Sequence, residues 1–277
     1  MEDQAGHYLI LDGDVKEASI PVQVNTTTGK TAYEVLRIIG GVPLFYQDHY
    51  DRLEGTLRVI GRPLEMTAGQ LKRNIKHLLE ANKTDTCNVK VAVFDECGKQ
   101  RQLVYISKSY YPSEEEADAG VKTGLFQMER HNPNAKLLDQ AYKEAVSAKI
   151  LEGGYFEALL VDSSGRITEG SKSNTFFVRA GKIFTAPGEF VLKGITRKYV
   201  FEACRNAGFE IIEQFVEAGS LLQVDGAFLS GTSIKVLPIK TIDDIALHSS
   251  ENSIVAAVRL EYNKLLEKYI DAYAKLW

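Results

Sequence analysis

The chain has 277 residues, 44% hydrophobic and 25% charged, which is typical of globular proteins rather than of disordered, fibrous or membrane proteins. Its formal net charge is −4 and neither sign dominates a long stretch, so we expect no nucleic-acid and no membrane partner. The three cysteines are widely spaced and the N-terminal residues do not resemble a signal peptide. We therefore expect a cytoplasmic protein that acts on small molecules, without a disulfide framework or a metal site.

The first part of the chain is predicted to be rich in strands. Alternating or β-branched residues predict strands at 8–12, 32–39, 42–46, 89–94 and 102–107. Apolar residues at helical spacing predict one helix at 47–60 and a second that begins at Thr67. Gly40-Gly41 predicts a hairpin turn. The acidic, polar residues 113–120 are predicted to be a solvated linker, so we expect an N-terminal α/β domain at 1–112.

Strands and helices alternate in the second part. Helices are predicted at 137–152, 196–207 and 252–275, with a short helical turn at 220–223. Strands are predicted at 157–161, 175–179, 182–186, 210–215 and 227–229. We expect a second, larger domain at 121–277, and the fold class is α/β or α+β.

Three segments of the second part could bind an anionic ligand with a ring. A glycine-containing turn at 192–197 precedes a helix, whose free N–H groups attract anions. Small hydroxyl residues and a glycine follow a strand at 230–233. Glu169 lies among glycine and serines between apolar strands, where it could be buried against a ring nitrogen. The alternatives are a plain helix start capped by Thr196 and a simple loop.

The order of several segments resembles the fold-type IV enzymes that use pyridoxal 5′-phosphate (PLP), a family that includes branched-chain and D-amino-acid aminotransferases and aminodeoxychorismate lyase. The resemblance covers most of the chain and rests on Tyr33-Glu34-Val35-Leu36-Arg37, His49-Tyr50-Asp51-Arg52-Leu53, Asn132-Pro133-Asn134-Ala135-Lys136, Thr168-Glu169-Gly170-Ser171-Lys172-Ser173-Asn174, Gly194-Ile195-Thr196-Arg197 and Ser230-Gly231-Thr232. Each motif is weak alone, but their common order is hard to obtain by chance. The resemblance implies a small N-terminal α/β domain, a larger C-terminal pseudo-barrel α/β domain and a homodimer.

The resemblance also implies roles for individual residues. Lys136 is implied to be the catalytic lysine, which forms the Schiff base with PLP and carries the substrate proton. The other implied cofactor contacts are Arg52, the amides of Ile195 and Thr196, and Thr232 for the phosphate, and Glu169 for the ring nitrogen. Tyr33, Arg37 and Ser233 are implied to lie on the substrate side. The alternatives are a surface lysine at 136, an ion pair of Arg52 with Asp51 or Glu54 on the helix surface, a core Tyr33, a surface Arg37 and a purely structural His49.

The function implied is transfer of an amino group between a small amino acid, with the branched-chain ones foremost, and a 2-oxo acid. Phe94-Asp95-Glu96-Cys97-Gly98 stands where D-amino-acid aminotransferases have a Thr-Arg-Gly segment, which disfavours that subgroup. Glu34 favours transamination over lysis. A PLP lyase of the aminodeoxychorismate type and a non-catalytic PLP-fold binding protein remain as alternatives.

Overall fold

The computed structural model describes residues 3–20, 22, 24 and 30–277, and the chain divides into two compact units. Unit 1 comprises Met1–Tyr110, Ala135–Ala141 and Leu266–Trp277, and unit 2 comprises Tyr111–Asn134 and Tyr142–Leu265. Each unit is made of separate segments of the chain, whereas the two domains predicted from the sequence are each one continuous segment. Those boundaries stay a prediction.

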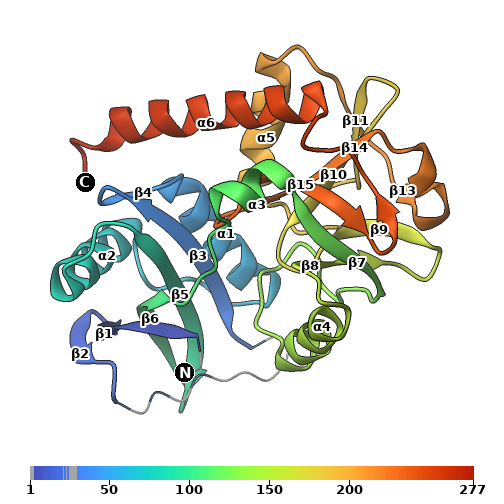
Figure 1. Cartoon of the computed structure of the whole chain (residues 1–277). Coiled ribbons are helices and arrows are strands. Elements are labelled where there is room, and N and C mark those ends of the chain that lie inside the picture. The colour runs from blue at the N-terminus through green and yellow to red at the C-terminus, as the bar shows by residue number, and fades with distance from the viewer. Residues whose placement is uncertain (1–2, 21, 23, 25–29) are drawn as a thin grey trace. The chain divides into compact units, whose positions relative to one another are not determined.

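Unit 1 is built on a six-stranded sheet in the order β2-β1-β6-β5-β3-β4, with every described neighbouring pair antiparallel (Figure 1). Its elements are β1 (Gln4–Leu11), β2 (Asp14–Glu17), β3 (Ala32–Ile39), β4 (Val42–Pro43), α1 (Tyr46–Val59), α2 (Ala68–Asn82), β5 (Cys87–Glu96) and β6 (Lys99–Ser107). Alternation along β3 buries Leu36 and Ile38 in a cluster with Leu53 of α1 and Ile75 of α2. The two helices therefore cover one face of the sheet.

Local sequence signals set two boundaries in unit 1. Gly40 and Gly41 have φ of 55° and 78°, which glycine adopts without strain, and they join Ile39 to its partner Val42 in the predicted hairpin. Helix α2 begins after a capping box: the Gln70 amide donates to Thr67 Oγ1 (3.2 Å) and the Thr67 amide donates to Gln70 Oε1 (2.8 Å).

Unit 2 is built on a ten-stranded mixed sheet that forms a half-barrel. Its strand order is β12-β11-β10-β14-β15-β7-β8-β9-β13, with β16 paired to β15. The elements are α3 (Glu114–Ala119), β7 (Val121–Gln127), α4 (Gln140–Gly153), β8 (Glu157–Val161), β9 (Arg166–Gly170), β10 (Asn174–Arg179), β11 (Lys182–Thr185), α5 (Ile195–Asn206), β12 (Ile211–Glu213), β13 (Val216–Glu217), the 3-10 helix η1 (Ala218–Gln223), β14 (Gly226–Gly231), β15 (Lys235–Ile242), β16 (Ile245–Ala246) and α6 (Ser253–Tyr273). The first residues of α4 and the last of α6 belong to unit 1.

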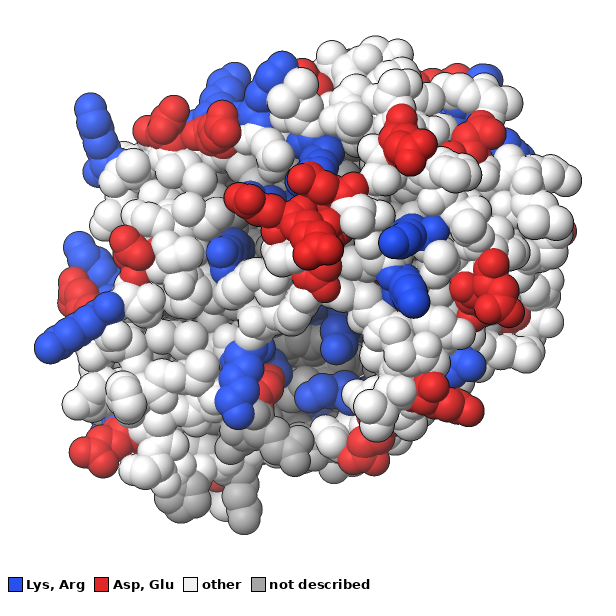
Figure 2. Space-filling model, in the orientation of Figure 1, with Lys and Arg blue, Asp and Glu red and all other residues white. Residues whose placement is uncertain are grey.

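The structure differs from the predicted elements at several places. The acidic residues predicted as a linker form the short helix α3, because Ser113 and Glu116 make a capping box. Acidic side chains gather where α3 lies (Figure 2). Helix α4 begins at Gln140 rather than at 137, since Leu137 is extended and bridges to Ala32. Within the strand predicted at 210–215 only β12 forms, and β2, β7, β9, β13, β15 and β16 were not predicted.

Among the described residues, no helix combines the length and the apolar character that a membrane crossing requires. Within the same part of the chain, no group of three or more His, Cys, Asp or Glu side chains is arranged to hold a metal ion.

Candidate active site

Lys136 lies in an extended segment of unit 1 that main-chain hydrogen bonds hold against the start of β3. The Tyr33 amide donates to the Lys136 carbonyl (3.0 Å), and the Leu138 amide donates to the Thr31 carbonyl (2.9 Å). The Lys136 amide donates to Thr56 Oγ1 of α1 (3.3 Å). The partly buried side chain places Nζ 4.8 Å from the centroid of the Tyr33 ring. The position of this lysine is therefore fixed by its backbone.

Alternation along β3 separates two sets of polar side chains. Tyr33 and Arg37 are partly buried and point to one face of the sheet, as their spacing predicted. Glu34 points to the other face and is only 1% exposed. The arrangement brings Tyr33 close to Lys136.

Arg52 of α1 is paired with Glu34. Its Nε and Nη2 donate to Glu34 Oε1 and Oε2, both at 2.7 Å, and His49 Nδ1 lies 2.7 Å from Oε2. Burial by itself would raise the pKa of Glu34, but the charge and hydrogen bonds of Arg52, with His49, lower it to about 2. Burial has the opposite effect on the imidazole and lowers the pKa of His49. The alternative pairing of Arg52 with Asp51 or Glu54 is therefore wrong: the partner is a strand residue 18 positions earlier.

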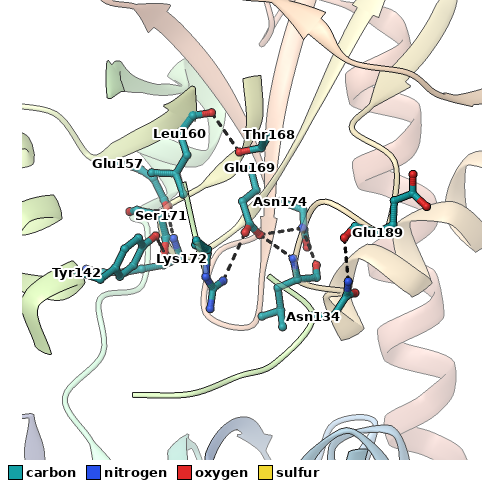
Figure 3. Close-up of polar contacts among 12 residues, drawn as sticks. Asn134, Tyr142, Glu157, Leu160, Thr168, Glu169, Ser171, Lys172, Asn174 and Glu189 are labelled. Carbon is teal, nitrogen blue, oxygen red and sulfur yellow. Dashed lines mark hydrogen bonds and ion pairs between the residues drawn. The ribbon is translucent and has the colours of Figure 1, made fainter. Parts of the chain in front are cut away.

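Glu169 of β9 is a fixed, buried carboxylate in unit 2. It is 3% exposed, and its Oε2 accepts from the Leu192 amide (3.1 Å) and from Asn174 Nδ2 (3.5 Å), which points toward it in Figure 3. Its Oε1 lies 3.4 Å from Nη1 of Arg130. A carboxylate held in place by a cation and by amide donors suits a protonated ring nitrogen as its partner.

The start of α5 in unit 2 is shaped for an anion. Its N-cap is Gly194, and no side chain caps it, so the alternative in which Thr196 is the cap is wrong. The first N–H groups of a helix lack partners within the helix, and here Ile195 and Thr196 carry two of them. A Cβ at position 194 would lie 2.2 Å from Asn174 Oδ1, so a larger residue there would displace the buried Asn174 side chain.

Neighbouring hydroxyl groups fit a ligand at the same end of unit 2. Ser230 pairs with Asn174 across β14 and β10. The Oγ atom of Ser230 is buried without a hydrogen-bond partner among the described residues, and a buried polar atom of this kind calls for one. Thr232 and Ser233 follow in the partly buried turn between β14 and β15. These residues fit a group rich in acceptor oxygens, such as a phosphate.

The predicted site residues therefore fall into two sets. Unit 1 holds Tyr33, Arg37, Arg52 and Lys136, and unit 2 holds Glu169, Ile195, Thr196, Thr232 and Ser233. Sequence reasoning missed two polar pairings, Glu34 with Arg52 and Arg130 with Glu169. Glu34 carried a usable signal, since it is a charged residue within an apolar strand, whereas nothing in the sequence around Arg130 indicated a role.

Comparison with known proteins identifies the family. The model of the class IV amino-transferases matches residues 31–242, more than half of the chain. The chain is 28% identical over 226 residues to a D-alanine aminotransferase of Bacillus licheniformis, covering 78% of this chain and 80% of the relative. It is 23% identical over 273 residues to a branched-chain-amino-acid aminotransferase of Escherichia coli, covering 88% of each.

A solved structure shows the same fold. It is the PLP form of a branched-chain amino acid aminotransferase from Thermobaculum terrenum, which matches with a TM-score of 0.82 and 23% identity over 99% of this chain and 97% of that one. The mixed α/β fold predicted from the sequence is thus confirmed, as is the predicted family. The chain belongs to the class IV aminotransferases.

Proposed function

We propose that this protein is a PLP-dependent aminotransferase that transfers an amino group between a small amino acid and a 2-oxo acid, with the branched-chain amino acids as the first substrates to test. The observation that carries the proposal is Lys136, a partly buried lysine held by its main chain beside β3. The family to which the chain belongs uses PLP. Relatives named for branched-chain substrates support the substrate class.

We assign the cofactor contacts as follows. Bound PLP supplies an electron-withdrawing ring and a carbonyl carbon that an amine can attack. From unit 1 we assign Lys136 Nζ as that amine, and Arg52 as a phosphate ligand. From unit 2 we assign the amides of Ile195 and Thr196 and the Thr232 hydroxyl to the phosphate. Glu169 is assigned to the ring nitrogen, where its fixed charge favours the protonated ring.

The substrate side and the proton transfer rest on this chain's own groups. With PLP bound, Lys136 Nζ would be the base that takes up and returns the proton of the substrate α-carbon. Tyr33, Arg37 and Ser233 are assigned to the substrate, of which Tyr33 is supported by its ring contact with Lys136. We further propose a cytoplasmic homodimer. The free thiols of Cys87, Cys97 and Cys204 suit a reducing compartment, and light scattering of the purified protein tests the dimer.

Two alternative functions differ in what they consume. A lyase of the aminodeoxychorismate type eliminates pyruvate and needs no amino acceptor, whereas an aminotransferase stops after one turnover unless a 2-oxo acid is added. A non-catalytic binding protein would take up PLP without converting any amino acid. No structural observation favours either alternative over transamination.

The test is an absorbance titration of the purified protein with PLP, followed by a panel of amino acids. We expect wild type to show the band of covalently bound PLP, and Lys136→Ala to lack it. Lys143→Ala, which removes an exposed lysine on α4, is the matched control and keeps the band. Conversion of the band by an amino acid, reversed by a 2-oxo acid, supports transamination. A covalent band that survives in Lys136→Ala would overturn the lysine assignment.

A further inference from the structure

The ring of Tyr33 has a second lysine beside it. Lys90 of β5 is 6% exposed, and its Nζ lies 5.1 Å from the Tyr33 ring centroid, while Lys136 Nζ lies 4.8 Å from the same centroid. The two ammonium groups are therefore within about 10 Å of each other, a range over which charges still interact in a partly buried site. A charge at Lys90 therefore acts at Lys136 Nζ, the atom assigned to react with the substrate.

The charge of Lys90 is cancelled by a residue from the start of the chain. Asp3 Oδ2 lies 2.6 Å from Lys90 Nζ, and the hydroxyl of Tyr105 donates to Asp3 Oδ1 (2.9 Å). The Lys108 amide donates to the Asp3 carbonyl (2.7 Å), so Asp3 extends the pairing of β1 with β6. A buried lysine needs such a partner, and the pair has no net charge.

We propose that Asp3 and Lys90 together set the charge preference of the amino-acid substrate, with Asp3 cancelling the Lys90 charge so that a neutral side chain is accepted in place of a carboxylate. The inference rests on the proposed function, in which the substrate reacts at Lys136. It assigns to Asp3 and Lys90 the role of specificity-determining residues. Without Asp3, the Lys90 ammonium would attract a second carboxylate on the substrate.

Four proteins with three different charges at this pair test the proposal. The net charge of the Asp3–Lys90 pair is zero in wild type, +1 in Asp3→Asn, −1 in Lys90→Gln and zero again in the double variant. We compare glutamate with glutamine, which have nearly the same shape but differ by one charge. The readouts are kcat/KM for each amino acid, and the Kd of glutarate and of its monoamide from titration calorimetry.

The expected preference follows the charge of the pair. A unit charge about 8–10 Å from a carboxylate, at an effective dielectric constant near 20 and with screening by salt, changes the preference by about 3- to 20-fold. Two ratios are compared: kcat/KM for glutamate over that for glutamine, and the affinity for glutarate over that for its monoamide. Asp3→Asn raises both ratios by that factor and Lys90→Gln lowers them. The double variant returns them to the wild-type value. Asp14→Asn and Lys16→Gln make the same charge changes at an exposed pair on β2 and leave the ratios unchanged.

Two outcomes would contradict the proposal in distinguishable ways. If all variants fold, as judged by their Tm, and the ratios stay at the wild-type value, the pair is structural only and the inference fails while transamination stands. If wild type converts no amino acid, the proposed function fails and this inference fails with it. Because Asp3 is 36% exposed, Asp3→Asn keeps the test decisive even where Lys90→Gln does not fold.

Discussion

Replacing Glu34 by glutamine is expected to destabilise unit 1 strongly. The substitution leaves Arg52, whose side chain is 14% exposed, without its anionic partner. Removing one member of a buried ion pair costs about 3–5 kcal/mol. The lowering of the Glu34 pKa from 4.5 to about 2 gives a similar value, because each pKa unit corresponds to about 1.4 kcal/mol. We expect the free energy of unfolding at pH 7 to fall by about 3 kcal/mol.

The pH dependence of this loss has a definite sign. The folded-state pKa of Glu34 is depressed, so its contribution to stability is complete above the unfolded pKa of 4.5 and declines as the pH falls towards 2. Acid therefore lowers the free energy of unfolding of wild type through Glu34. The variant has no ionisable group at position 34 and lacks this contribution. The difference between the two proteins should be less than half as large at pH 3 as at pH 7.

The fluorescence of the single tryptophan can report on unit 1 during urea unfolding. Trp277 belongs to unit 1, and its ring packs edge-on against Tyr46 of α1 with centroids 4.8 Å apart. The control is Glu54→Gln, which removes an exposed i,i+4 pair with Arg58 on the same helix and should cost less than about 0.5 kcal/mol. A loss below about 1 kcal/mol for Glu34→Gln, or a loss equal at pH 7 and pH 3, would refute the reasoning.

Two further substitutions test other parts of the structure. Gly194→Ala places a methyl group against Asn174 and should weaken PLP binding about tenfold or more in an absorbance titration. Gly219→Ala is the control, because nothing lies within 4 Å of its added Cβ; equal PLP affinity in both variants would remove the glycine at 194 from the binding site. Thr67→Ala removes the cap of α2 and should lower the free energy of unfolding by about 1 kcal/mol, and an unchanged urea midpoint would show that other groups replace the cap.

Features that depend on neighbouring residues were predictable from the sequence. The hairpin at Gly40-Gly41 and the start of α2 after Thr67 were both placed correctly, because turn and cap chemistry act within a few residues. The family was predictable for another reason, which is that the order of the motifs survives even where each motif is weak. The start of α4 was predicted wrongly, since Leu137 is held by Ala32, about a hundred positions away.

Partners that are distant in sequence could not be predicted. The sequence offered Asp51 and Glu54 as partners for Arg52, whereas its actual partner, Glu34, lies on a different element. Which carboxylate reaches a guanidinium depends on how a helix packs against a strand, and this packing has no local signature. Arg130 beside Glu169 is a second case. The roles of the candidate site residues therefore stay predictions that the experiments above address.

The main-chain hydrogen bonds around Lys136 do not depend on its reactive side chain. Backbone N–H and C=O groups at 33, 136 and 138 make the same hydrogen bonds whatever side chain stands at position 136. A chain that lost this lysine during evolution would thus keep the extended segment and the sheet next to it. Catalysis could then be gained or lost by one substitution without refolding the protein, which offers a simple path between an enzyme and a binding protein on this fold.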